Sequence, residues 1–213
     1  MGCSDAANAR LTDPLLAEVP ATTSPLKTLV SLLATRSAKR GDFVLASGRR
    51  SSLYVDCRLT TMSPEGQLLI GRIGLAALHD TGWTVDAVGG LTLGADPISY
   101  AIAHASALAA ERGEGEMVRA FTVRKEPKQH GTGKLIEGPF VRGDRVVVVE
   151  DVITTGGSAL RAIEAVRAAG GTVVGVFALV DREEGGREAI EACGLAVRAL
   201  VPASALLAEM PTV

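Results

Sequence analysis

Residues 146–160 read VVVVEDVITTGGSAL, and this stretch decides the fold of the chain. Four consecutive valines are typical of a strand that is buried on both faces of a parallel sheet. Two carboxylates, Glu150 and Asp151, follow at the carboxyl end of that strand, which is the edge where open α/β sheets bind their ligands. A turn of hydroxyls and glycines comes next, and from Ala159 the apolar residues recur at helical spacing. The stretch therefore predicts a strand, a polar turn and a helix within an α/β domain.

The turn itself, residues 154–158 (TTGGS), has the chemistry of a phosphate site. Glycines let the backbone come close to a ligand, free N–H groups point outward, and the positive end of the helix dipole favours an anion. It is not a Walker A loop, because no lysine follows its last glycine, and the GxGxxG pattern is missing here as well. A carboxylate beside a phosphate would repel it, so the acidic pair must face ribose hydroxyls, Mg²⁺ or a cation formed during reaction. The alternative is an Asp-capped helix after a buried strand, with no ligand.

Composition and charge limit the class of protein. A length of 213 residues suits one α/β domain with additions, and 47% hydrophobic residues are ample for its core. A net charge of −2 lacks the basic footprint of nucleic-acid-binding proteins, so we expect no nucleic-acid partner. No apolar run approaches the length of a bilayer span, so we expect no membrane partner. Three cysteines without metal-ligand spacing, Cys3, Cys57 and Cys193, favour a reducing cytoplasm.

The first residues are expected to lie outside the folded domain. The opening MGCS suggests N-myristoylation, but Ala6 stands where that motif needs Ser or Thr. No apolar region of the kind that a signal peptide needs is found there. We therefore expect residues 1–23 to be a poorly ordered extension and residues 24–213 to form a single domain.

Helix starts and a hairpin are predicted in the N-terminal half. The dipeptide Ser-Pro at 24–25 and again at 63–64 predicts a capped helix start, and the second helix is expected to turn Leu69, Ile73 and Ala76 inward. Between them, residues 41–58 read GDFVLASGRRSSLYVDCR, two β-like runs around a Ser-Gly-Arg turn, which predicts a hairpin. On composition alone, an ordinary exposed hairpin and a lid over a ligand are equally open.

Two further segments have an ambiguous chemistry. A short strand at 85–88 leads into a glycine-rich turn at 89–95, which is either an anion site or a place of close packing, and Asp96 is expected to cap the next helix. After a strand at 117–123, residues 124–134 (RKEPKQHGTGK) crowd cations with Pro and Gly, which predicts a mobile loop. A solvated basic loop is the simpler alternative, but in a slightly acidic chain an anionic ligand would relieve the repulsion.

Arg182 follows the next predicted strand, residues 172–180, at the same edge of the sheet as the acidic pair. An exposed arginine in an acidic loop, here DREEGG at 181–186, is most often a surface residue without a ligand. The remaining segments, 195–200 and 203–210, predict a last strand and helix that close the domain.

Three of these segments resemble the orotate phosphoribosyltransferases, a branch of the type I phosphoribosyltransferase family. Residues 146–160 resemble the PRPP-binding signature, 41–58 the N-terminal hood and 124–134 the catalytic loop. The resemblance spans roughly residues 24–210 and implies an α/β type I phosphoribosyltransferase fold, a central, mostly parallel sheet flanked by helices, with a small N-terminal hood over about residues 24–60.

The resemblance also implies the reaction. The 5-phosphoribosyl group of PRPP is transferred to orotate, giving orotidine 5′-monophosphate and diphosphate in the pyrimidine pathway to UMP, with Mg²⁺ as cofactor. Another base-specific phosphoribosyltransferase, or a PRPP-sensing regulator of the same fold, is the alternative.

Individual residues inherit expected roles from the resemblance. Lys128, Glu150 and Asp151 are expected to be catalytic. The basic loop, the acidic pair and the following turn are expected to bind PRPP, namely Arg124, Lys125, Lys128, His130, Glu150, Asp151, Val152, Ile153, Thr154, Thr155, Gly156, Gly157 and Ser158. Thr154 and Arg182 are expected to bind orotate, for which a guanidinium suits the carboxylate or ring carbonyls. Mg²⁺ is expected to be held mainly by substrate and water, without dedicated protein ligands.

The resemblance implies a cytoplasmic homodimer in which the basic loop reaches the neighbouring subunit's site. The chain departs from some family members in three places. Ala46 stands where some have a lysine, and Leu93-Gly94 stand where some have a Tyr-Lys pair. Glu150 replaces an aspartate that is common in first place of the acidic pair. The substrates are therefore expected to meet fewer cations here than in those relatives.

Overall fold

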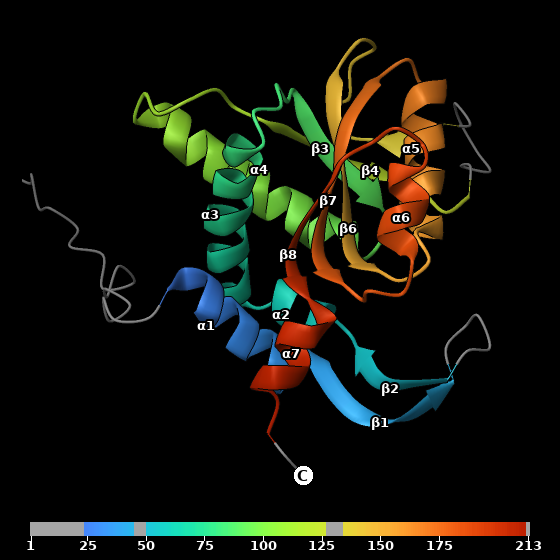
Figure 1. The fold of residues 1–213 in the computed structure, drawn as a ribbon. Coiled ribbons are helices and arrows are strands. Elements are labelled where there is room, and N and C mark those ends of the chain that lie inside the picture. The colour runs from blue at the N-terminus through green and yellow to red at the C-terminus, as the bar shows by residue number, and fades with distance from the viewer. Residues whose placement is uncertain (1–23, 45–49, 127–133, 212–213) are drawn as a thin grey trace, which may run out of the picture.

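The computed structural model describes residues 24–44, 50–126 and 134–211. A six-stranded sheet with the strand order β5-β4-β3-β6-β7-β8 forms its centre (Figure 1). The strands are β3 (Ala87–Leu91), β4 (Arg119–Val123), β5 (Ile136–Glu137), β6 (Arg145–Ile153), β7 (Thr172–Asp181) and β8 (Val197–Pro202). Neighbouring strands pair in parallel except β4 and β5, which are antiparallel. The expected α/β class with a mostly parallel sheet is confirmed.

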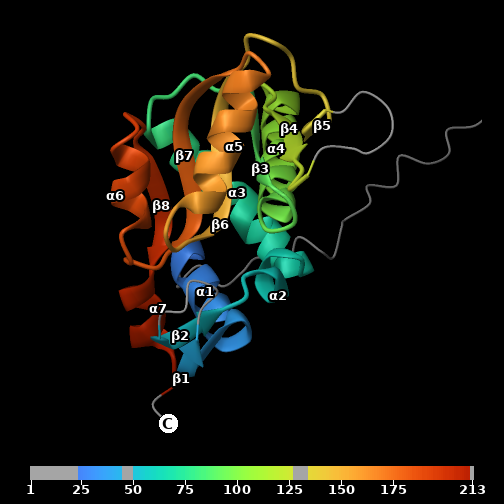
Figure 2. The same ribbon diagram turned by 90° about the vertical axis from the view of Figure 1, so that its right-hand side faces the viewer.

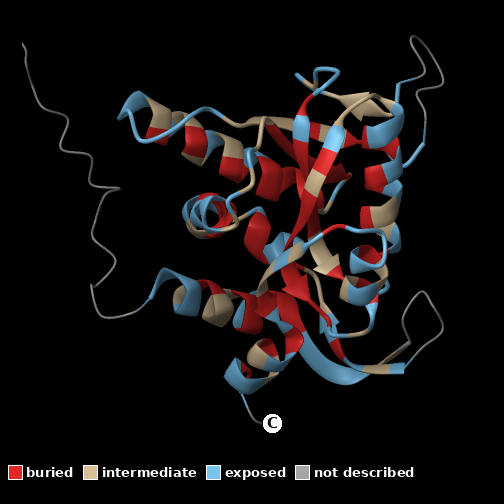
Figure 3. Ribbon diagram, turned by 45° about the horizontal axis from the view of Figure 1, so that its top comes forward, coloured by how far each residue is buried: buried red, intermediate tan, exposed pale blue. Residues whose placement is uncertain are grey.

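The valine run explains why β6 lies at the centre of the sheet. Val147 and Val149 pack into the core on one face, whereas Val146 and Val148 pack into the core on the other. The first face is covered by α3 (Pro64–Asp80) and α4 (Ala95–Glu111), and the second by α5 (Gly157–Ala168) and α6 (Gly186–Glu191). Figure 2 views the sheet from the α5 side, and Figure 3 shows the buried residues gathered in the strands and in the helix faces that cover them. A strand that is apolar on both faces is stable only between two such layers.

The segment expected to form the hood contains two helical pieces and a hairpin. They are α1 (Pro25–Leu32), the π-helix η2 (Leu33–Ser37), β1 (Ala38–Val44) and β2 (Arg50–Val55). The two strands are antiparallel, so the predicted hairpin is confirmed, although β1 begins at Ala38, ahead of the predicted segment. A short helix, α2 (Arg58–Thr61), leads on to α3. The last helix, α7 (Ala203–Glu209), directly follows β8 and packs against α1, which places the hood at the carboxyl edge of the sheet (Figure 1).

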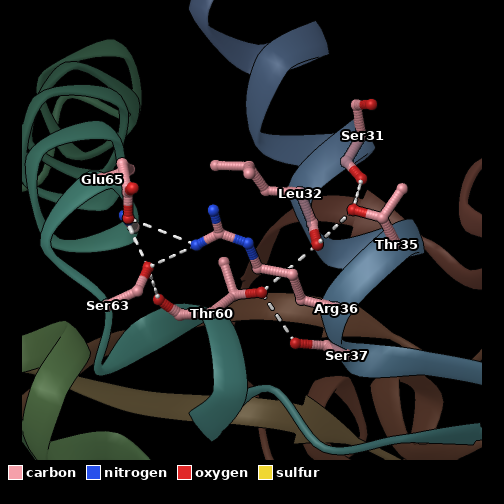
Figure 4. Close-up of polar contacts among 9 residues, drawn as sticks. Ser31, Leu32, Thr35, Arg36, Ser37, Thr60, Ser63 and Glu65 are labelled. Atoms are coloured by element: carbon pink, nitrogen blue, oxygen red, sulfur yellow. Dashed lines mark hydrogen bonds and ion pairs between the residues drawn. The ribbon is translucent and has the colours of Figure 1, made fainter.

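Polar contacts attach the base of the hood to the helix layer (Figure 4). Arg36 Nη1 on η2 lies 3.2 Å from Glu65 Oε2 and 3.3 Å from Ser63 Oγ. Ser63 also caps α3, because its hydroxyl accepts an amide hydrogen bond from the first turn, as the Ser-Pro pattern predicts. The buried hydroxyls of Ser37 and Thr60 share a hydrogen bond of 2.7 Å. The start of the hairpin is therefore held against α2 and α3.

The glycine-rich segment 89–95, predicted as a turn, is half strand in the structure. β3 continues through Gly89 and Gly90 to Leu91, residues 92–94 form a turn, and α4 begins at Ala95. Gly94 is at the N-cap position, so Asp96 lies inside the helix and is not its cap. A Cβ atom on Gly90 would lie 1.9 Å from the carbonyl oxygen of Val149. Gly90 therefore serves the close approach of β3 to β6, which is the packing alternative left open by the sequence.

Four sequence segments lie outside the described residues. They are 1–23, 45–49, 127–133 and 212–213. The expected N-terminal extension, the Ser-Gly-Arg turn with Ala46, and most of the basic loop fall within them. Among the residues that are described, no helix is both long and apolar enough to cross a membrane.

Candidate active site

The strand order reverses between β3 and β6, and both strands contribute to the candidate site. From β3 the chain passes through α4 to β4, and from β6 it passes through α5 to β7 on the opposite side. Such a reversal leaves a crevice at the carboxyl edge of the sheet, where ligands bind. A cavity of about 210 Å³ opens at this point, lined by Arg58, Leu91, Thr92, Leu93, Gly94, Lys125, Glu150, Asp151 and Ser158. We refer to it as the central cavity.

The two carboxylates of the acidic pair have different surroundings. Glu150 is 7% exposed, and its Oε2 atom is buried without a hydrogen-bond partner among the described residues. Burial, reinforced by the neighbouring Asp151 carboxylate, raises the pKa of Glu150 well above its usual range. Asp151 is partly exposed, and its Oδ1 accepts a 3.0 Å hydrogen bond from the amide of Val152. A Cβ atom on Gly94 would lie 2.4 Å from that same oxygen, so the β3–α4 turn passes close to the carboxylate, and a larger residue at 94 would require the Asp151 side chain to shift.

The predicted phosphate turn joins β6 to α5. Gly156 has φ +80°, which favours glycine, and α5 begins at Gly157 rather than at the predicted Ala159. A small cavity of about 40 Å³ is lined by Glu150, Val152, Ile153, Thr154, Thr155, Gly156, Gly157 and Ser158. It shares Glu150 and Ser158 with the central cavity. Because the first amides of a helix have no partner within it, this turn has the free donors that an anion site needs, and anion binding stays a prediction.

The phosphate turn packs against α6, a helix that the sequence analysis did not predict. A Cβ atom on Gly186, the first residue of α6, would lie 2.4 Å from the carbonyl oxygen of Thr154. Likewise, a Cβ atom on Gly156 would lie 2.9 Å from the carbonyl oxygen of Gly186. The two backbones thus touch directly. The glycine pair at 185–186 was the only signal in the sequence, and an acidic loop explains such a pair equally well.

The predicted cations of the basic loop are brought only partly to the site. Lys125 lines the central cavity. Arg124 lies in a neighbouring cavity of about 280 Å³, and its Nη1 is 3.5 Å from Glu137 Oε1. Lys128 and His130 lie outside the described residues. The sequence analysis missed Arg58, which lines the central cavity although it was considered only as the end of the hairpin.

Arg182 is not an exposed surface residue, so that alternative is wrong. Its side chain is 4% exposed, and Nη2 donates to Ser51 Oγ at 2.7 Å and to Glu184 Oε1 at 2.8 Å. Its Nε is buried without a hydrogen-bond partner in the described part of the chain. The amide of Arg182 donates to the carbonyl of Ile153 at 2.9 Å, which brings Arg182 beside Thr154 at the ends of neighbouring strands. The two predicted orotate-binding residues are therefore neighbours, and Ser51 links them to the hood.

Glu150 and Asp151 could supply some, but not all, of the oxygen ligands of a magnesium ion in the central cavity. No group of three or more His, Cys, Asp or Glu side chains that could hold a metal occurs within residues 24–44, 50–126 and 134–211. The buried Oε2 of Glu150 has no partner there, and Asp151 lines the same space. Since Mg²⁺ commonly keeps waters and substrate phosphate among its ligands, this donor set fits an ion that arrives with a phosphorylated substrate.

A larger groove lies away from the acidic pair. It measures about 490 Å³ and runs between α5 and the segment around β5, lined by Lys134, Leu135, Ile136, Gly138, Phe140, Arg142, Ala165, Ala168 and Ala169. Its lining is mainly apolar, and no carboxylate lines it among the residues that the structure describes. Size alone does not make it the reaction site, and the convergent polar groups are in the central cavity.

Comparison with known proteins assigns the class first. The phosphoribosyl transferase domain family matches residues 71–208, a span that contains the acidic pair, the phosphate turn and Arg182. An acidic pair and a hydroxyl–glycine turn at the reversal point of a parallel sheet agree with that match. Fold and site together define a phosphoribosyltransferase of the type I fold.

More similar relatives narrow the class. The orotate phosphoribosyltransferase of Aquifex aeolicus is 48% identical over 182 residues, which cover 84% of this chain and 96% of that protein. That of Rhodopirellula baltica is 46% identical over 179 residues, or 82% and 90% of the two chains. The crystal structure of Mycobacterium tuberculosis orotate phosphoribosyltransferase in complex with PRPP is 43% identical, with a TM-score of 0.69 over 86% of this chain and 99% of that one. The chain belongs to the orotate phosphoribosyltransferase family.

Proposed function

We propose that this chain transfers the 5-phosphoribosyl group of PRPP to orotate and so supplies orotidine 5′-monophosphate for pyrimidine biosynthesis. N1 of orotate forms a bond to C1′ of the sugar while the bond from C1′ to the diphosphate oxygen breaks, and its electron pair leaves with diphosphate. The observation that carries the proposal is the junction of an acidic pair and a phosphate turn at the point where the sheet reverses. Family membership agrees with it.

At the sugar end, the protein acts mainly by placing charged and polar groups around the phosphoribosyl group. The amides and hydroxyls of residues 154–158 hold the 5′-phosphate, and α5 adds the positive end of its dipole. Glu150 and Asp151 then face the ribose hydroxyls from the adjoining strand. As the sugar becomes electron-poor, the Asp151 carboxylate favours the developing positive charge without having to move.

At the base end, Arg182 binds orotate together with Thr154. The guanidinium keeps further N–H donors beside those that Ser51 and Glu184 occupy, including the unpartnered Nε. A planar fork of donors matches a carboxylate or a pair of ring carbonyls better than an ammonium group does. Ser51 comes from the hood, so the hood helps to orient the residue that recognises the base.

Cations complete the site around the diphosphate. Lys125, together with Arg124, Lys128 and His130 of the basic loop, neutralises the diphosphate and excludes the water that would hydrolyse the sugar cation. Lys128 is the loop residue to which we assign a contact made chiefly in the transition state. Mg²⁺, when bound, adds positive charge at the phosphate oxygens, and Glu150 and Asp151 are the protein groups available to it.

A direct assay tests the reaction. Orotate absorbs ultraviolet light differently from its ribosylated product, so the purified protein should reduce orotate absorbance when both PRPP and Mg²⁺ are present. Leaving out either one should stop the change, and uracil or adenine in place of orotate should give no comparable turnover. Conversion of another base at a higher kcat/KM than orotate would contradict the proposal.

We also propose that the protein acts in the cytoplasm as a homodimer that shares the basic loop between subunits. In support, four large apolar side chains near the site are about half exposed, namely Leu59, Met62, Leu93 and Tyr100. They lie on or beside α2 and α4, two helices that contact each other. Exposed apolar groups gathered in this way are typical of interfaces.

Mixing two inactive variants tests the shared loop. A Lys128→Ala subunit keeps a sound acidic pair, and an Asp151→Asn subunit keeps a sound loop. If the loop acts across the interface, each mixed dimer has one intact site and should regain up to about half of the activity of a wild-type dimer. Mixed dimers, verified by mass, that stay inactive would place the loop in its own subunit's site.

A further inference from the structure

We propose that Arg58 is a further PRPP-binding residue and that its guanidinium contacts the diphosphate group. This inference rests on the function proposed above. Arg58 belongs to the segment between β2 and α3, residues 56–63, which we call the hood–core connection. Neither the acidic pair nor the basic loop includes it.

The position of Arg58 is the first argument. It is the first residue of α2 and lines the central cavity together with Lys125, Asp151 and the turn at 92–94. Its side chain is 48% exposed, so an incoming ligand can reach it. Among the described residues, the cavity is lined by no cation besides Arg58 and Lys125.

The layout of the two cavities shows which part of PRPP should meet Arg58. They share Glu150 and Ser158. If the small cavity holds the 5′-phosphate and the acidic pair holds the ribose, C1′ and its diphosphate extend into the central cavity. That cavity already contains two carboxylates, so a diphosphate there needs compensating cations. The turn at 92–94 (Thr-Leu-Gly) supplies none, and Arg58 lines the same cavity.

Arg58 is held in a defined orientation while keeping donors free. Its Nε lies 2.8 Å from Asp56 Oδ1 and its Nη2 lies 2.9 Å from Oδ2, a bidentate pair. The hydrogen bonds from Arg58 also lower the pKa of Asp56, so the pair persists at neutral pH. A guanidinium has more N–H groups than one carboxylate can engage, and Nη1 remains for an anion.

The backbone around Arg58 is fixed on both sides. The amide of Asp56 donates to the carbonyl of Ser37 at 2.8 Å, and the buried Cys57 thiol lies 3.7 Å from the carbonyl oxygen of Asp151. The segment is thus tied to the hood on one side and to the acidic pair on the other. A cation mounted on such a segment is positioned before the ligand arrives, which lowers the entropic cost of binding.

An ordinary surface ion pair is the competing explanation, and the chain offers a matched control for it. Arg112 also pairs with a carboxylate two residues away, Glu114, at 2.7 Å. It lies at the end of α4 and does not line the central cavity. Arg58→Ala and Arg112→Ala therefore remove the same charge and the same kind of pair, and only the first removes a group from the cavity.

Calorimetric titration with three ligands tests the proposal. PRPP and inorganic diphosphate, each with Mg²⁺, should bind Arg58→Ala roughly 10- to 100-fold more weakly than the wild type, the range for a lost hydrogen bond to a charged group. Ribose 5-phosphate, which has the phosphate but no diphosphate, should bind within about twofold of wild type. Arg58→Lys should recover part of the affinity, because it restores the charge but not the fork. Arg112→Ala should change none of the three.

The outcomes separate this inference from the function on which it rests. If the wild type binds diphosphate and Arg58→Ala binds it equally well, Arg58 is not a ligand although the enzyme assignment stands. Equal weakening of ribose 5-phosphate and diphosphate in a variant with wild-type circular dichroism would show a structural effect and overturn the inference as well. If the wild type binds neither PRPP nor diphosphate, the proposed function itself fails.

Discussion

The phosphate turn and the hood hairpin border the same site, but different forces hold them. The turn leaves β6, whose four valines are fully buried, and its backbone packs directly on the first residue of α6. The hairpin has two strands and a largely exposed β2, and side-chain contacts attach it, such as Ser51 with Arg182. Buried backbone contacts leave little room for adjustment, whereas a two-stranded hairpin alone is marginally stable.

This difference suggests a division of labour between the two ends of the substrate pair. The turn proposed to hold the sugar phosphate is preformed, because moving it would disturb the central strand and α6 together. The proposed base end depends on where the hairpin lies. Buried Ala38 and Leu53 pack the hairpin into the core, and polar contacts such as that of Ser51 with Arg182, of about 1 kcal/mol each, add to this. Changes on the core side should therefore affect the chemical step or the fold, and changes on the hood side should affect orotate in particular.

The largest effect is expected from Asp151→Asn, which removes a charge on the core side without changing size. We expect kcat to fall by roughly 100- to 1,000-fold, as when one electrostatic partner of a transition state is lost. Steady-state kinetics with both substrates saturating measures this. Asp42→Asn, on the exposed hairpin, is the matched control and should leave kcat unchanged. A kcat for Asp151→Asn within about twofold of wild type would remove Asp151 from the mechanism.

Gly156→Ala should strain the backbone of the phosphate turn and so reduce the stability of the fold. The added methyl group meets both a positive φ and the Gly186 carbonyl, so we expect about 2–4 kcal/mol of lost stability and weaker binding of ribose 5-phosphate. Gly194→Ala is the control, because Gly194 also has a positive φ but open space around it. It should lose only about 1–2 kcal/mol. Equal losses in urea unfolding would mean that the packing on α6 contributes nothing.

Arg182→Ala addresses the base end. Its loss should raise KM for orotate by an amount equivalent to about 2–3 kcal/mol, with a much smaller change in KM for PRPP. The partly buried Glu184 also loses its partner, so Arg182→Lys serves as a second variant that keeps the charge. Equal effects on both substrates would indicate that Arg182 has a purely structural role.

Ser51→Ala is the smaller test on the same side, because it removes one hydrogen bond from the hood to Arg182. We expect KM for orotate to rise by about 3- to 10-fold, the range for a single net hydrogen bond, with kcat nearly unchanged. Ser52, the next residue on β2, is exposed, and Ser52→Ala should behave like wild type. If the two variants are indistinguishable, the hood does not orient Arg182.

The smallest effect is a change of slope in the pH dependence of stability. The pKa of Glu150 is raised in the folded protein, mainly by burial, so its protonated form is favoured there. The corresponding stability is present below its unfolded pKa of about 4.3 and is lost as pH rises through the higher folded pKa. Glu150→Gln cannot titrate and should flatten the fall in unfolding free energy above that pH. If the unfolding free energy of the variant falls with pH as steeply as that of the wild type, groups other than Glu150 cause the fall.

Sequence patterns predicted the elements that obey a single local rule. The valine run requires two covered faces, Ser63 caps a helix, and alternating runs on either side of a turn form a hairpin. The acidic pair could be placed at the carboxyl edge because strand direction alone determines that edge. These inferences need no knowledge of distant contacts.

The features that the sequence did not predict depend on contacts between distant segments. Ala76 is exposed although it was expected to face inward, and Ile70 and Gly74 are buried instead. A Cβ atom on Gly71 would lie 2.6 Å from the carbonyl of Ala101, so the glycine lets α3 pack closely on α4. Arg58 enters the site for a similar reason, because the hood–core connection runs beside β6. No periodicity in the sequence reports such contacts.

A crystal structure with PRPP and Mg²⁺ would test the central claim most directly. We predict that the 5′-phosphate accepts hydrogen bonds from the amides of residues 154–158, with the ribose hydroxyls against Glu150 and Asp151 and the diphosphate between Lys125 and Arg58. A sugar phosphate bound anywhere else, such as in the apolar groove beside α5, would contradict the account.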